Sequence, residues 1–79
     1  MIELSIITPT ENKILFIEWI EVVSPTGIFW VGPDHAALVS LVKHKAPILF
    51  KESGKDAEVY EASNGIFYIN CNKATLLCS

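Results

Sequence analysis

The chain has 79 residues and a net charge of −3, with six lysines and no arginine. It is therefore one domain at most, and it lacks the dense basic face that nucleic-acid-binding proteins carry. Hydrophobic residues make up 51% of the chain, which excludes a disordered protein.

The N-terminal residues predict a strand followed by a turn. Ile2, Leu4 and Ile6 alternate with other residues, and this period of two is typical of a half-buried strand. Pro9 and Asn12 then mark a turn, because both residue types interrupt regular structure.

Residues 13–23 predict a second, longer strand, since they are rich in β-branched and aromatic side chains. Two polar positions in this run, Glu18 and Glu21, are three residues apart. A regular strand cannot place both on one face, so we expect a β-bulge near Trp19 or Ile20.

Residues 24–27 have the sequence SPTG, which is typical of a β-turn, and the apolar run IFWV follows as a short strand. Neighbouring residues of a strand face opposite ways. Either Phe29 or Trp30 should therefore point outward, where an exposed aromatic side chain can anchor a partner.

Residues 33–43 fit two structures. Pro33 suits the first turn of a helix, and Asp34 would lie near its positive end. The following apolar residues are compatible with a helix and with a strand, so the pattern by itself leaves both open.

The C-terminal half predicts more strands, beginning with residues 46–52, in which Pro47 requires a strand start or a sheet edge. Six to nine short strands separated by turns indicate an all-β fold, either a sandwich or a flattened barrel. The turn signals lie at 53–56, 63–65 and 71–73, the last within a hairpin of residues 66–70 and 74–78.

The residues with catalytic or metal-binding chemistry do not form a known motif. Asp34 and His35 are adjacent, and adjacent side chains usually diverge, so their order is no evidence for an oriented dyad. Ser40 lacks the G-x-S-x-G context of a nucleophile. No three ligands that include His35 or His44 have a known zinc spacing. We expect His35 to be hydrogen-bonded within a turn.

The two cysteines, Cys71 and Cys78, match no metal or redox motif and predict reduced thiols in a cytosolic protein. The first residues have no basic region and no long apolar block, so no signal peptide is expected. No run approaches the ~18 apolar residues of a membrane span. We therefore expect a soluble, cytoplasmic protein.

Three segments in order resemble the N-terminal β-sandwich domain of the epsilon subunit of F-type ATP synthases. They are LSIITPTEN, then EVVSPTG followed by VGPDHAALVSLV, and SNGIFYINCNKATLLC. The family motifs are I-V-T-P, G-x-x-G-I-L-P-G-H-A-P-L and G-G-F-x-E-V-x-x-N-x-V-T-V-L. The match is colinear over residues 1–79, which we expect to form a single domain.

The resemblance implies a flattened sandwich of two sheets with about ten short strands. It implies a non-catalytic rotor subunit that joins the gamma subunit to the c ring and couples ion flow to ATP synthesis. Such a chain has no cofactor, no metal and no nucleic-acid partner, and it is peripheral to the cytoplasmic face of the inner (plasma) membrane. The implied contacts with gamma and the c ring are Ile28, Phe29, Trp30, Asp34, His35, Ala36, Leu38 and Ser40.

The chain departs from the family in the middle motif. Family members usually have Gly where Trp30 and Asp34 stand, and Pro where Ala37 stands. Ile28 and Trp30 fall in the loop that faces the ring. Because the register on both sides is intact, we expect extended structure at residues 36–42.

Many epsilon subunits continue into a C-terminal pair of helices that inhibits ATP hydrolysis and in some members binds ATP. The resemblance here covers only the sandwich, so we expect neither property. The alternative hypothesis is a free-standing β-sandwich interaction module that diverged from the family. A small hydrolase using Asp34 and His35 is the third.

Overall fold

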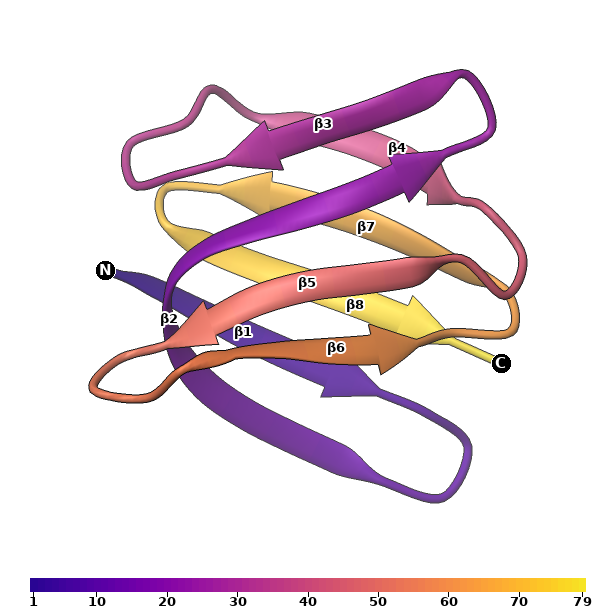
Figure 1. Ribbon diagram of the computed structural model, residues 1–79, viewed down its shortest axis with the longest axis horizontal. Coiled ribbons are helices and arrows are strands. Elements are labelled where there is room, and N and C mark those ends of the chain that lie inside the picture. The colour runs from indigo at the N-terminus through magenta and orange to yellow at the C-terminus, as the bar shows by residue number, and fades with distance from the viewer.

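The computed structural model describes residues 1–79, which form eight β-strands and no helix (Figure 1). This confirms the all-β prediction, with eight strands in place of about ten. The strands are β1 (Ile2–Ile7), β2 (Asn12–Ser24), β3 (Gly27–Val31), β4 (Leu38–Val42), β5 (Pro47–Glu52), β6 (Ala57–Glu61), β7 (Gly65–Asn70) and β8 (Lys73–Cys78).

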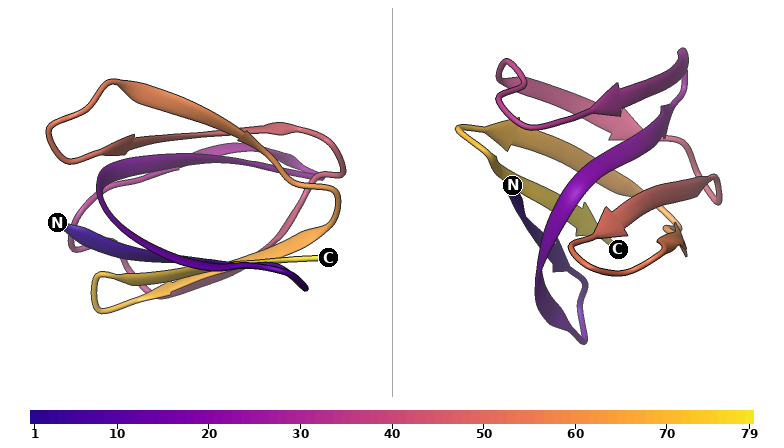
Figure 2. Two further views of the ribbon diagram at one scale, coloured as in Figure 1. Left: turned by 90° about the horizontal axis from the view of Figure 1, so that it is seen from below. Right: turned by 60° about the vertical axis from the view of Figure 1, so that its left-hand side comes forward.

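The strands form one continuous sheet in the order β4-β7-β8-β1-β2-β5-β6, with β3 as a further neighbour of β2. All pairs are antiparallel except β1 and β8. The sheet folds over on itself into two layers, which Figure 2 shows edge-on in its left view. The predicted flattened sandwich is therefore present, and both layers belong to the same sheet.

Strand β2 connects the two layers because it is long enough to belong to both. Its first half pairs with β1, and its second half lies between β3 and β5. The register with β5 shifts between Ile17 and Trp19, which confirms the expected bulge. The extra residue lets Ile17 and Ile20 both point into the core although they are three positions apart.

Residues 36–42 are extended only in part, because β4 starts at Leu38. The backbone of β4 pairs with β7 along its whole length, and this ladder takes the place of the helix that the apolar pattern also allowed. Strand β5 starts at Pro47, as predicted, and it lies between β2 and β6 and not at an edge.

The core lies between the layers and takes inward-facing residues from every strand except the edge strand β6, whose Tyr60 packs at the core margin. Ile2, Leu4 and Ile6 are all buried there, as their alternation predicts. Phe29 packs inward against Phe67, with ring centroids 6.1 Å apart. No helix has the length and apolar character that a membrane crossing requires.

Candidate protein-docking surface

The adjacent Asp34 and His35 lie in the loop between β3 and β4, and each makes hydrogen bonds to a different residue. The Asp34 backbone N–H donates to Oδ1 of Asn72 at 2.7 Å, and the Asn72 amide donates to Asp34 Oδ1 at 3.0 Å. Nδ1 of His35 is 2.7 Å from the carbonyl oxygen of Ala36. The two side chains therefore do not bond to each other, and His35 is hydrogen-bonded within the loop as expected.

Asn72 joins three segments of the chain at this end of the molecule. Besides its two bonds with Asp34, its carbonyl accepts from the backbone N–H of Glu3 at 2.9 Å. Asp34 has a φ of 61° and Asn72 has a φ of 60°, a left-handed conformation that aspartate and asparagine tolerate better than most residues. Both residue types therefore suit the backbone conformation at their positions.

The metal-ligating residue types are dispersed over the fold. No three His, Cys, Asp or Glu side chains gather closely enough to hold an ion. Ser40 donates its hydroxyl to the carbonyl of Leu41 at 2.9 Å, and no histidine bonds to it. The Ser40 hydroxyl and the His35 ring are therefore both engaged with nearby backbone carbonyls.

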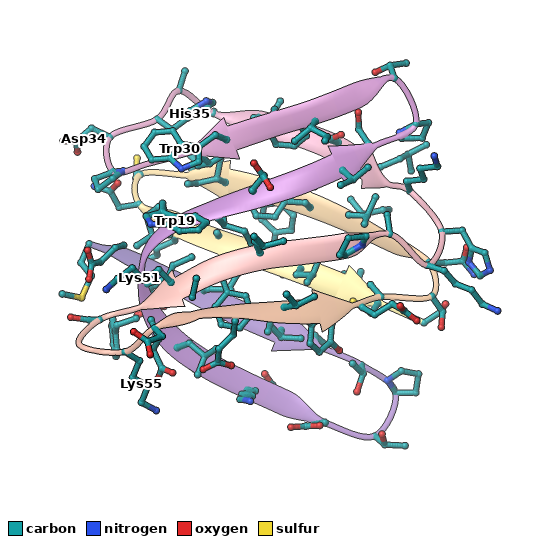
Figure 3. All side chains as sticks on the ribbon, viewed as in Figure 1. Trp19, Trp30, Asp34, His35, Lys51 and Lys55 are labelled. Atoms are coloured by element: carbon teal, nitrogen blue, oxygen red, sulfur yellow. The ribbon has the colours of Figure 1, made fainter.

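The eight partner-contact residues expected from the resemblance do not form one surface. Ile28 and Trp30 point outward from β3, with 66% and 57% of their surface exposed, and Figure 3 shows Trp30 beside the loop that carries Asp34 and His35. Phe29 and Leu38 pack against the core. Ala36 lies exposed in the loop, and Ser40 is half-buried on β4.

A continuous exposed apolar surface lies elsewhere, on the outside of β4, β7 and β8. The register places Leu41 opposite Ile66 and Ile66 opposite Leu77, so that the three form a row across the sheet. A second row places Val39 opposite Tyr68. We call this surface the apolar face; it consists of Val39, Leu41, Ile66, Tyr68 and Leu77, each between 41% and 74% exposed.

A shallow open cavity of about 360 Å³ lies at one margin of the apolar face. Leu41, Ile66 and Leu77 form its apolar walls. A cavity of this kind is suited to one large apolar side chain from a partner, because interface anchors are usually held in such depressions. The full lining is Leu41, Asn64, Gly65, Ile66, Leu77, Cys78 and Ser79.

The apolar face is not among the surfaces predicted from the sequence. The sequence does contain a relevant pattern. Strands β4 and β7 carry apolar residues on both sides, whereas a half-buried strand would alternate apolar and polar residues. A strand with two apolar sides predicts either burial in a layered core or an outer surface that a partner covers.

Below the cavity, Tyr60 of β6 and Cys78 of β8 meet across the two layers. The Tyr60 hydroxyl and the Cys78 thiol lie close enough to shift each other's pKa. Burial raises the pKa of the Cys78 thiol above its ordinary 9.0, and the neighbouring Tyr60 hydroxyl partly offsets this rise. Burial also raises the pKa of Tyr60 above 10.0, with smaller contributions from Cys78 and Glu11. Both groups are therefore neutral at physiological pH, and Cys78 is an unreactive thiol.

No protein-family model and no curated protein matches the chain. Among solved structures, the fold is similar to that of a chain from the central stalk/c-ring of Tetrahymena thermophila mitochondrial ATP synthase. The TM-score is 0.80, with 11% identity over 98% of this chain.

The fold is also similar to that of a chain from the Euglena gracilis mitochondrial ATP synthase, in a structure of OSCP, F1 and the c-ring. The TM-score is 0.83, with 16% identity over 98% of this chain. The chain spans 62% and 49% of the lengths of the two chains that it matches. At these identities the similarity establishes a shared fold.

Proposed function

We propose that the chain is a non-catalytic subunit of the central stalk of an F-type ATP synthase. In this role it docks the gamma subunit onto the c ring and couples ion flow to ATP synthesis. It is peripheral to the membrane on the cytoplasmic side and requires no cofactor. The proposal is supported by the colinear resemblance over 79 residues and by the fold shared with chains of two ATP synthase structures.

The apolar face is the observation that carries the docking role. A subunit that transmits torque needs a broad and stable interface with its partner, and burial of apolar surface stabilises such an interface. The five side chains of this face carry no charge. We therefore assign the apolar face to the gamma subunit. The contact of the outer end of β3 with the c ring, through residues such as Ile28, stays a prediction.

The test replaces one well-exposed residue of the apolar face, on its outer strand β4. Leu41→Asp places a charge where gamma is expected to exclude water, so affinity should fall by at least about tenfold. Binding to the gamma subunit of the same organism is measured by isothermal titration calorimetry. Leu41 is 62% exposed, and the substitution should therefore leave the fold intact.

Val59→Asp is the matched control, because Val59 is 67% exposed on the other layer and the charge change is identical. It should bind gamma as the wild type does. A wild-type chain that does not bind gamma would contradict the proposed function. Equal binding by the wild type and Leu41→Asp would contradict the assignment of the apolar face.

A further inference from the structure

A second exposed surface lies on the opposite layer, on the outside of β3, β2, β5 and β6. The register aligns Trp30 with Glu21, Glu21 with Leu49 and Leu49 with Val59 in one row across four strands. We call these four residues the Trp30 face. Its ends are exposed, with Trp30 at 57% and Val59 at 67%, and its centre is half-buried.

The indole of Trp30 is held in place by the backbone next to it. A Cβ atom built on Gly32 would lie 2.7 Å from Cζ3 of Trp30 and closer still to Cη2, so the ring lies directly over the glycine. One side of the ring is thus fixed, while the side chain remains more than half exposed. An aromatic side chain ordered before binding loses little conformational entropy when a partner arrives.

Glu21 is the direct cross-strand neighbour of Trp30, and its carboxylate has no partner in the molecule. The two salt bridges join Lys51 to Glu18 at 2.7 Å and Lys55 to Glu52 at 3.2 Å, so neither involves Glu21. None of the side-chain hydrogen bonds involves it either. Directly opposite residues of antiparallel strands have Cβ atoms about 5 Å apart.

An aromatic ring and an unpaired carboxylate at that spacing attract the same kind of group. The π-face of tryptophan attracts a cation, and the carboxylate accepts hydrogen bonds from it. A guanidinium fits best, because it is planar, stacks on an indole and binds a carboxylate through two parallel N–H donors. Leu49 and Val59 continue the row as an apolar surface beside this position.

We propose that the Trp30 face binds a protein partner that inserts an arginine between Trp30 and Glu21, with apolar residues flanking the arginine. The chain has no arginine, so a second copy of it cannot supply the guanidinium. The surface is on the other layer from the apolar face. The inference therefore goes beyond the proposed function and does not depend on it.

The experiment titrates the full chain, labelled with ¹⁵N, with two capped tripeptides, acetyl-Leu-Arg-Leu-amide and acetyl-Leu-Gln-Leu-amide. The indole N–H signal of Trp30 is assigned by its loss in Trp30→Phe. We expect the arginine peptide to shift this signal and the Glu21 amide, and to bind about threefold or more tightly than the glutamine peptide.

Glu21→Gln keeps the shape of the side chain and removes its charge, so the preference for arginine should disappear. Glu58→Gln is the matched control, since it makes the same charge change at an exposed residue on β6 and should keep the preference. Spectra of both variants without peptide verify that they fold. Equal binding of the two peptides to the wild type, or shifts confined to residues outside the Trp30 face, would overturn the proposal.

Discussion

The side chain of Trp30 packs over the backbone of Gly32, the first residue after β3. In the motif that this segment resembles, Gly stands at the position of Trp30 and Leu at the position of Gly32. Here the large residue, Trp30, comes first and the small one, Gly32, follows, and the indole of Trp30 lies over Gly32. Trp30 therefore fills space that a side chain at position 32 would otherwise occupy. This gives the unusual tryptophan a structural role in addition to any contact with a partner.

The exchange predicts that positions 30 and 32 are energetically coupled. Gly32→Leu alone should force the indole off the backbone, and Trp30→Gly alone should leave Gly32 uncovered. The double variant should be more stable than the sum of the single effects predicts, by about 1 kcal/mol. The free energy of unfolding of all four proteins in urea measures this coupling, and additive effects would show that the two positions are independent.

Two local features of the backbone, a bulge and a tight turn, determine which strands can pair. The bulge in β2 lets one strand serve both layers, and a tight turn joins β7 to β8. Both turn residues have positive φ, 51° at Cys71 and 60° at Asn72. Two such residues match the twist of a hairpin, and asparagine and glycine adopt this conformation most easily. Asn72 is therefore well suited to its position, whereas Cys71 is not.

Substitutions at Cys71 should change stability in opposite directions. Cys71→Asn should raise the free energy of unfolding, because asparagine tolerates a left-handed backbone. Cys71→Val should lower it by about 1 kcal/mol, since a β-branched side chain is strained there. Cys71 is exposed, so neither change disturbs the core. Urea midpoints that are equal for the two variants would contradict a backbone cause.

The whole molecule depends on contacts between its two layers, which β2 joins on one side only. On the open side, β6 meets β8 through Tyr60 and Cys78. Burial raises the pKa of the Cys78 thiol and the pKa of the Tyr60 hydroxyl, so both groups are neutral in the folded state. In the unfolded chain the thiol loses its proton at its ordinary pKa near 9.0.

This difference predicts that the protein becomes less stable at alkaline pH. A pKa raised by folding contributes its full stability below the unfolded value and loses it as pH rises, because the unfolded state gives up its proton first. The free energy of unfolding should therefore decline as the pH rises through the ordinary thiol value of 9.0 and above it. Cys78→Ala should make this decline shallower. Cys71→Ala, which removes the exposed thiol, should not, and the same slope in both variants would exclude Cys78 as the cause.

Much of the fold could be predicted from local pattern. The alternation of residues 2–7, the bulge near Trp19 and the turns follow from the geometry of a strand, which involves only near neighbours. The outward direction of one of Phe29 and Trp30 was predicted in the same way. That Trp30 is the exposed one depends on β3 pairing with β2, which places Phe29 against Phe67.

The surfaces that contact partners depend on residues that are distant in sequence. Leu41 and Leu77 are as apolar as any core residue, and only the register of β4, β7 and β8 brings them together on the outside. Glu21 and Trp30 become neighbours only when β2 pairs with β3. Local alternation determines which residues form strands, whereas the pairing of strands and the folding of the sheet into two layers decide which apolar side chains remain exposed to water.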